Sequence, residues 1–341
     1  MSGTVRWGIL STADIGVRKV IPGIRKAARC EVVAIASRDG EQARAVADQL
    51  GIPSAHASYE ALLADPGVDA VYIPLPNHMH MDWTIAALRA GKHVLCEKPL
   101  AMTADDAQRM VDVAHETGLH LMEAFMYRQH PSWVAAMDLV ESGRIGTLTA
   151  VQSWFSYYND DATNIRNIVE YGGGALFDIG CYTINLSRMV FGGEPLHIQA
   201  SVRRDRATGV DALVSAILDF DGGIASFTCA IRSESDQRVH IYGTKGRISV
   251  EIPFNIPPDR PTRVFVTAGG DPPVAPATET LTFDTADPYT VEGERFASAI
   301  LDGLPTPIPP DDAVANLRVI EAVFAAGTRG TGVATAAGGV S

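Results

Sequence analysis

The chain has 341 residues and a formal net charge of −12. This acidic balance argues against a nucleic-acid or anionic-membrane surface, and a composition with 46% hydrophobic and 20% charged residues excludes disordered and collagen-like classes. A chain of this length predicts two domains and, with this charge, a small-molecule partner.

The four cysteines are too widely spaced for a zinc site or a disulfide framework, so we expect reduced thiols and no bound metal. The first residues lack the basic segment and apolar core of a secretion signal. No apolar run is long enough to cross a bilayer. We therefore expect a cytoplasmic protein that is neither secreted nor inserted in a membrane.

The first elements are typical of a dinucleotide-binding fold. Residues 5–10 form an apolar run that predicts a buried strand, and a helical pattern follows up to Ile24. In the turn between them, Ser11 and Ala13 replace two glycines of the usual Gly-x-Gly-x-x-Gly, and Gly16 remains. We expect this turn to hold the cofactor pyrophosphate beside the helix N-terminus, through Ser11, Thr12, Ala13, Asp14 and Ile15.

The second predicted strand, residues 32–36, is followed by Ser37, Arg38 and Asp39. An NAD enzyme places an acidic residue near this point for the ribose 2′-hydroxyl, whereas a hydroxyl and a guanidinium suit a 2′-phosphate. We predict NADP, held by Ser37 and Arg38. Because the acidic Asp39 follows directly, NAD is the alternative cofactor.

Strands and helices continue to alternate up to residue 124, which predicts a doubly wound parallel sheet. Helices are expected at 41–50, 59–64, 81–90 and 103–117, and strands at 70–73, 93–96 and 119–124. Ligands bind where the carboxyl ends of such strands meet. The segments after two of these strands supply further expected cofactor contacts, namely Leu75, Pro76, Asn77, His80, Glu97 and Lys98.

After Phe125 the pattern changes to consecutive strands. A helix at 131–141 precedes strands at 147–157, 196–204, 212–220, 224–231, 238–243 and 247–252. The expected fold is α/β, with an N-terminal Rossmann domain over residues 1–124. An α+β domain with a large open, mostly antiparallel sheet follows over residues 125–330. We expect residues 253–276 to form an irregular surface segment. Helices are expected at 289–301 and 311–326, and residues 331–341 are expected to form a frayed tail.

One face of the second sheet is expected to expose apolar side chains that another protein surface must bury. Trp154, Phe155, Phe227 and Ile241 lie on its predicted strands, and we expect them on the face that the helices leave open. We therefore predict a homodimer, or a higher homo-oligomer, packed through that face.

A further helix, at 174–191, carries Asp178 and Tyr182 four residues apart, so a carboxylate and a phenol share one helix face. Taken alone, the pair is better explained by a half-buried Tyr182 and an Asp178 that caps a local group. Lys98 comes directly after a predicted strand, at the edge where ligands bind, and is followed by Pro99. A lysine in such a turn is a candidate for chemistry.

Three motifs of the chain resemble the Gfo/Idh/MocA oxidoreductases, named for glucose–fructose oxidoreductase and inositol dehydrogenase. The motifs are Pro76-Asn77-x-x-His80, Glu97-Lys98-Pro99 and Asp178-Ile179-Gly180-Cys181-Tyr182. The segment 122–131 is similar to the branch with dimeric dihydrodiol dehydrogenases and NADP-dependent xylose dehydrogenases. The resemblance implies a dimer, a cis bond before Pro99, and catalytic roles for Lys98, Asp178 and Tyr182.

We predict that Tyr182 is the acid/base, that Lys98 lowers the pKa of its hydroxyl, and that Asp178 orients the substrate hydroxyl or the lysine. The roles of Lys98 and Tyr182 are exchangeable at this stage. The residues expected to bind substrate are Tyr127, Arg128, Trp154, Tyr157, Asp178 and Tyr182.

The predicted substrate is a carbohydrate, with oxidation of an aldose at C1 favoured. Many polar side chains lie in segments that could reach the pocket, and they suit a polyhydroxylated ligand. Besides residues already named, they are His130, Asn159, Asp160, Asn164, Arg166 and Asn167. The alternatives are a trans-dihydrodiol dehydrogenase, an inositol-type NAD dehydrogenase and a non-catalytic NADP-binding regulator.

Overall fold

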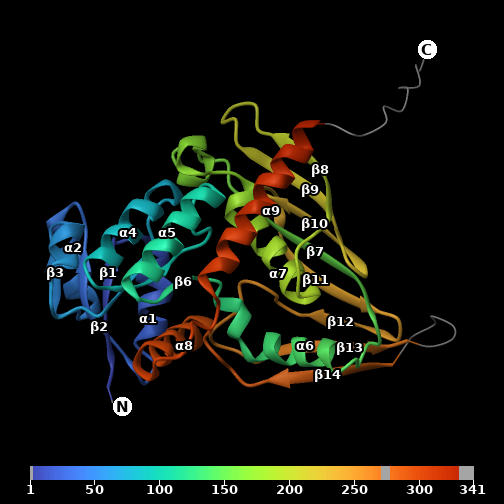
Figure 1. Ribbon diagram of the computed structural model, residues 1–341, viewed down its shortest axis with the longest axis horizontal. Helices are drawn as coiled ribbons and strands as arrows, with labels where there is room; N and C mark the ends of the chain where they lie inside the picture. Colours follow the sequence, from blue (N-terminus) through green and yellow to red (C-terminus); the bar gives the residue numbers. More distant parts are fainter. Residues whose placement is uncertain (1–2, 270–276, 330–341) are drawn as a thin grey trace.

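The computed structural model describes residues 3–269 and 277–329, which form two sheets (Figure 1). The first has six strands, all parallel, in the order β3-β2-β1-β4-β5-β6. The order reverses between β1 and β4, the kind of point at which open α/β sheets bind ligands. The strands are β1 (Val5–Leu10), β2 (Cys30–Ala36), β3 (Ser54–His56), β4 (Ala70–Ile73), β5 (His93–Cys96) and β6 (Leu121–Glu123).

Helices connect these strands and cover both faces of the sheet, so β4 is buried at every position. Side-chain caps fix several helix starts: Asp39, Ser58 and Thr103 each accept hydrogen bonds from backbone N–H groups of the next turn. The helices are α1 (Ile21–Ile24), α2 (Gly40–Leu50), α3 (Tyr59–Leu63), α4 (His80–Arg89) and α5 (Ala104–Thr117). None of the described helices is long and apolar enough to cross a membrane.

The second sheet has eight strands in the order β14-β13-β12-β11-β7-β10-β9-β8. Its pairs are antiparallel except for β7 with β10, which run parallel. The predicted fold class is therefore confirmed. The strands are β7 (Leu148–Tyr158), β8 (His197–Arg204), β9 (Asp211–Phe220), β10 (Gly223–Ala230), β11 (Arg232–Gly243), β12 (Gly246–Val250), β13 (Thr262–Ala268) and β14 (Thr278–Phe283).

The prediction of an irregular segment over residues 253–276 is wrong for its central part, which forms β13. The prolines before it, at 257, 258 and 261, precede the strand and do not interrupt it, so its ladder with β12 is intact. Residues 270–276 and the predicted tail at 331–341 lie outside the described residues.

Helices cover one face of the second sheet: α6 (Pro131–Glu141), α7 (Cys181–Phe191) and α9 (Pro310–Arg329) (Figure 1). Phe155, Phe227 and Ile241 are buried, contrary to the expectation that they lie on the open face. Trp154 does lie on the open face, where it is 37% exposed. Side chains alternate along a strand, so neighbours such as Trp154 and Phe155 point to opposite faces.

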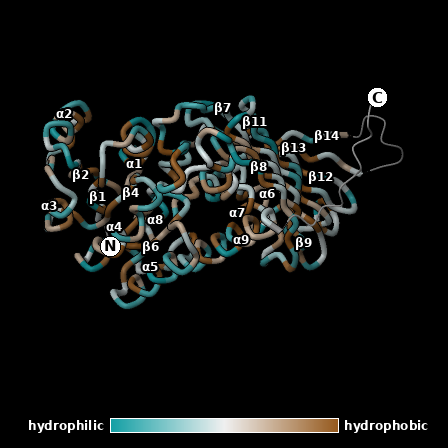
Figure 2. Tube along the Cα trace, turned by 90° about the horizontal axis from the view of Figure 1, so that it is seen from above, coloured by the Kyte–Doolittle hydropathy of each residue, from teal (hydrophilic) through white to brown (hydrophobic). Residues whose placement is uncertain are grey.

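Helix α8 (Pro288–Asp302) packs against the first sheet domain, although it lies in the segment 125–330 assigned to the second. The Phe296 ring contacts the Trp7 ring at 5.7 Å, and Thr290 donates to the Gly23 carbonyl at 2.8 Å. Seen from above, the two sheets lie toward opposite ends of the molecule, with α7 and α9 between them (Figure 2). The chain thus returns to its first domain near its end.

Candidate active site

A cleft of about 1170 Å³ is lined by residues of both sheet domains. The first domain contributes the turn after β1 and the segments after β4 and β5, as expected for the carboxyl edge of a parallel sheet. The second domain contributes the end of β7, the loop after it and the start of α7. The cleft therefore combines a cofactor side and a substrate side.

The predicted cofactor turn lies at the cleft. Ala13, Asp14 and Ile15 line it, and Ser11 shapes the turn with a φ of 133° and an Oγ that accepts from the Ala13 N–H at 3.1 Å. Lys19 lines the same end and could meet a phosphate charge. Leu75, Asn77, Glu97 and Lys98 also line the cleft, whereas Thr12 and Pro76 adjoin lining residues without lining it themselves. Small side chains and a lysine at this end fit a bound dinucleotide.

The end of β2 favours a cofactor with a 2′-phosphate. Asp39, which kept NAD as an alternative, caps α2 by accepting from the N–H groups of Glu41 at 3.0 Å and Gln42 at 3.1 Å. Ser37 accepts from the Asp39 N–H at 3.1 Å, and Arg38 is exposed. The Asp39 carboxylate thus caps α2 through Oδ1, and the neighbouring Arg38 guanidinium is exposed and could meet a 2′-phosphate.

His80 supports the cleft from behind. The ring is completely buried, and its nitrogens lie 2.9 Å from the Pro99 carbonyl and 2.7 Å from the Leu75 carbonyl. Burial lowers the pKa of His80 to about 4, so the neutral ring donates to one of these carbonyls. The Lys98–Pro99 bond is cis, as the resemblance implies. His80 was predicted to bind the cofactor, but the structure places it beneath the residues that line the cleft.

Asp178 is the centre of the polar network on the substrate side. The Lys98 ammonium donates to the Asp178 carbonyl at 2.7 Å and to its Oδ1 at 3.3 Å. Oδ2 accepts from the Tyr157 hydroxyl at 2.5 Å and from Arg166 Nε at 3.0 Å. Burial alone would raise the pKa of Asp178, but Lys98 and Arg166 outweigh it and lower the value to about 2. The carboxylate is therefore ionised and engaged by three side chains.

The backbone that carries Asp178 differs from the predicted helix at 174–191. A π-helical turn, Leu176–Gly180, holds Asp178, and α7 begins only at Cys181. Gly174 has a φ of 119° and lies against Asp211, where a side chain could not fit. Asp178 and Tyr182 are thus carried by two successive helical elements, and both line the cleft.

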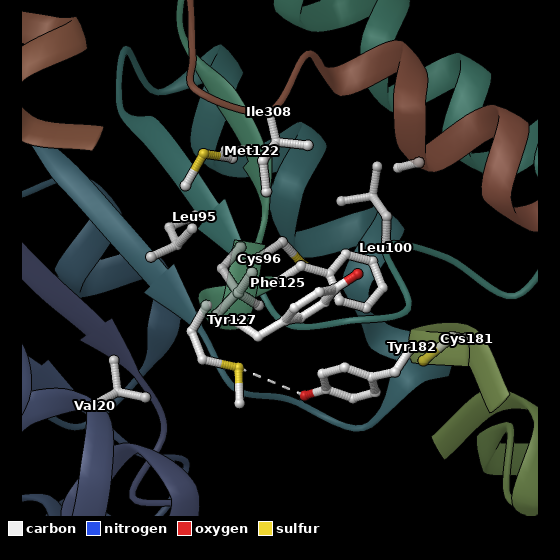
Figure 3. Close-up of a cluster of buried hydrophobic side chains, with 14 of the residues drawn as sticks. Val20, Leu95, Cys96, Leu100, Met122, Phe125, Tyr127, Cys181, Tyr182 and Ile308 are labelled. Carbon is white, nitrogen blue, oxygen red and sulfur yellow. Dashed lines mark hydrogen bonds between the residues drawn. The ribbon is translucent and has the colours of Figure 1, made fainter. Parts of the chain in front are cut away.

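The ring of Tyr182, and not its hydroxyl, is the part that lies close to the Lys98 ammonium. The Lys98 ammonium lies 5.1 Å from the centre of the Tyr182 ring. The Tyr182 hydroxyl lies 3.7 Å from the Met126 sulfur, a contact drawn as a dashed line in Figure 3. Phe125, Phe155 and Phe254 pack around the ring. Lys98 was predicted to lower the pKa of the Tyr182 hydroxyl, but burial raises that pKa well above its usual value, and the ammonium faces the ring and not the hydroxyl. The phenol is thus held rigidly at the cleft and is neutral in this arrangement.

Three side chains predicted to bind substrate do not line the cleft. Tyr127 is completely buried and donates to Asn185 at 2.7 Å, because the turn that carries it faces α7. Arg128 donates to Asp312 of α9 at 2.6 Å. Trp154 lies on the open face of the second sheet and does not line the cleft; its indole N–H donates to Ser156, which does, at 2.8 Å.

Other lining residues carried no sequence signal that connects them with the cleft. Tyr289 comes from α8, whose return to the first domain is not visible in any local pattern. The first half of β11 and the residues directly after β12 also contribute, and these residues are Ser235, Asp236, Gln237, Glu251 and Ile252.

Comparisons with known proteins cover most of the chain. Residues 5–125 match a model described as an oxidoreductase family with an NAD-binding Rossmann fold, and residues 133–249 match a Gfo/Idh/MocA C-terminal domain. An uncharacterised oxidoreductase of Rhizobium meliloti is 44% identical over 96% of this chain and 98% of its own. An NADP⁺-dependent D-xylose 1-dehydrogenase of Haloferax volcanii is 41% identical over the same shares. A trans-1,2-dihydrobenzene-1,2-diol dehydrogenase of Mus musculus is 34% identical over 72% of this chain and 74% of its own.

Two solved structures are similar over nearly the whole chain. The 3-ketoreductase KijD10 of Actinomadura kijaniata, in complex with NADP and TDP-benzene, has a TM-score of 0.86 and 31% identity, and covers 95% of this chain and 98% of that one. Aldose-aldose oxidoreductase of Caulobacter crescentus, complexed with glycerol, has a TM-score of 0.88 and 27% identity over 97% and 100%. KijD10 has also been solved with a lysine or a tyrosine replaced, and these two residues are separated by the same number of positions as Lys98 and Tyr182.

Proposed function

Because the chain belongs to the Gfo/Idh/MocA family of oxidoreductases, we propose that it oxidises an aldose at C1 with NADP. The observation that carries this proposal is the Lys98–Asp178 ion pair beside the Tyr182 ring, at the carboxyl edge of β5. The names of the xylose dehydrogenase and the aldose-aldose oxidoreductase support a sugar substrate. A non-catalytic regulator would have no need of all three candidate catalytic residues, so the presence of Lys98, Asp178 and Tyr182 argues against that alternative.

NADP, when bound, accepts the hydride that leaves the substrate carbon. The substrate hydroxyl must also lose a proton, and we assign its acceptance to the phenolate form of Tyr182, which forms once the neutral phenol has released its own proton to solvent in the cleft. A positive charge over the ring face favours the phenolate, and Lys98 places its ammonium there. Asp178 is engaged by Lys98, Tyr157 and Arg166, so its role is to orient the lysine and not the substrate hydroxyl.

The alternative that a specific observation favours is oxidation of a trans-dihydrodiol. Aromatic rings line parts of the cleft, among them Phe155, Tyr157 and Tyr171, and relatives with that activity are known. The two substrate classes are separated by kcat/KM for xylose, glucose and a cyclic trans-diol with NADP. We expect a sugar to be the best substrate. A diol preferred by about tenfold or more over every sugar would overturn the aldose assignment.

The cofactor preference rests on Arg38. We expect Arg38→Ala to weaken NADP binding by about 1–3 kcal/mol, the range for a lost charge-assisted contact, and to leave NAD binding nearly unchanged. Fluorescence titration with each cofactor measures both affinities. Equal loss for NADP and NAD would refute a contact between Arg38 and the 2′-phosphate, because only NADP carries that group.

We also propose that a second copy of the chain covers the open face of the second sheet. Trp154 lies on this face, and Ile217 and Ile224 on β9 and β10 are 44% and 49% exposed. Burial of such residues favours association through a two-fold axis. Sedimentation at micromolar concentration is expected to show a dimer, and a stable monomer would contradict the proposal.

A further inference from the structure

Arg166 is placed at the cleft by a loop whose own hydrogen bonds fix it. The loop turns through a short 3-10 helix, Ile165–Asn167, capped by Asn164, whose side chain accepts from the Arg166 N–H at 3.1 Å. Asn167 is 3% exposed, and its amide donates to the Asp161 carbonyl at 2.7 Å. The Gly174 N–H donates to the Arg166 carbonyl at 2.9 Å. The Arg166 backbone is thus held from both sides.

The same loop also contacts the first domain. Asn77 donates to the Gly172 carbonyl at 3.0 Å, and the His78 ring stacks on the Tyr171 ring at 4.5 Å. Arg166 therefore has a defined position relative to both sides of the cleft. A side chain held in this way needs little ordering when a ligand binds.

Arg166 uses only part of its guanidinium inside the protein. Its Nε donates to Asp178 Oδ2, and within residues 3–269 and 277–329 neither terminal nitrogen has a hydrogen-bond acceptor. The side chain lines the cleft and is 43% exposed. Two adjacent terminal nitrogens with several N–H groups are therefore available to a ligand in the cleft.

The other cations that line the described part of the cleft are placed for different tasks. Lys19 lies at the turn after β1, on the cofactor side. Lys98 directs its ammonium to the carbonyl and carboxylate of Asp178. Two bonds leave the ammonium one N–H, whereas Arg166 keeps two adjacent terminal nitrogens for a ligand on the substrate side.

We propose that Arg166 is a specificity-determining residue that donates hydrogen bonds from its terminal nitrogens to two neighbouring oxygens of the substrate. This inference rests on the proposed function and deepens it. The planar guanidinium presents two donors side by side, which suits two adjacent hydroxyl oxygens of a sugar. Asp178 pairs with both Lys98 and Arg166, and further carboxylates of the second domain line the cleft, on Asp160, Asp161, Asp236 and Glu251. Negative charge therefore exceeds positive charge on this side, and the fitting ligand is an uncharged polyol and not a sugar phosphate.

The test compares Arg166→Lys with the wild type on xylose and on xyloses that lack one hydroxyl, at position 2, 3 or 4. Lysine can keep a charge beside Asp178 but cannot present two parallel donors. We expect KM for xylose to rise by about tenfold in Arg166→Lys, with kcat changed by less than about threefold. For the deoxy sugar that lacks a contacted hydroxyl, the wild type has already lost the contact, so the substitution should raise KM much less.

Arg232→Lys is the matched control, because Arg232 donates to Asn167 in the same loop but does not line the cleft. Any effect of this variant should be equal for xylose and all the deoxy sugars. A rise in KM that is equal for all sugars in Arg166→Lys, or no rise for any, would overturn the inference and leave the proposed function standing. A wild type that oxidises no aldose would refute the proposed function and the inference with it.

Discussion

Lys98→Met is expected to lower kcat by about a hundredfold or more, the scale of a lost acid–base or charge-stabilising group. The ammonium lies over the Tyr182 ring and is held by Asp178, so its loss removes the charge that favours the phenolate. Methionine nearly preserves the length of the side chain, which limits the change to the charge and its hydrogen bonds. Steady-state kinetics with NADP and the best aldose measures the effect.

The companion variants are Tyr182→Phe and the double substitution. Each single change should cost about a hundredfold, and the double change should be little worse than either, because the two groups act as a unit. Lys26→Met is the control, since Lys26 also pairs with an aspartate, Asp287 at 2.9 Å, but on the surface. Fully additive losses, or a single active-site variant with normal kcat, would contradict the assignment.

The parallel sheet domain was predictable because each of its signals is local. The strand at 5–10 is an apolar run interrupted by Arg6, the strand at 70–73 is a continuous apolar run, and both are found with those boundaries, as β1 and β4. Thr103 and Asp39 are N-caps of helices whose first turns contain acidic residues. A capping residue followed by acidic residues can be recognised in the sequence itself. Such features depend on neighbours within one or two turns of the chain.

The candidate site was predictable only in part, because several of its contacts join distant segments. Lys98 and Asp178 stand out by motif, but the bond from Tyr157 to Asp178 depends on how β7 faces the turn before α7. Tyr289 reaches the cleft because α8 returns to the first domain. Tyr127 is polar and near the motif segments, yet its hydroxyl is satisfied in the core by Asn185. Tertiary packing decided these cases.

Asp178→Asn is expected to lower both activity and stability, because the carboxylate is the shared partner of two cations. Removing its charge leaves Lys98 and Arg166 facing each other without compensation, and loss of one partner in a buried pair costs about 3–5 kcal/mol. The amide cannot accept from all three donors that now reach the carboxylate. Lys98 would then lose its orientation, and kcat should fall by about a hundredfold.

The stability difference between wild type and Asp178→Asn should depend on pH in a defined way. The pKa of Asp178 is lowered to about 2 in the folded chain, against 3.8 as the ordinary value. A depressed folded pKa contributes stability that is present above the unfolded pKa and is lost as pH falls toward the folded one. Urea unfolding should therefore give a constant difference above about pH 5 that shrinks below about pH 4.

Asp312→Asn separates a role in the site from a role in folding. Asp312 on α9 accepts from Arg128 at 2.6 Å and pairs with Arg188 at 3.0 Å, away from the cleft. Its replacement removes a carboxylate shared by two arginines, so a comparable loss of stability is expected, with kcat reduced far less than in Asp178→Asn. If both variants lost stability and kcat in the same proportion, Asp178 would act only through the fold. A larger loss of kcat for Asp178→Asn at equal stability assigns its carboxylate to positioning Lys98 for the reaction.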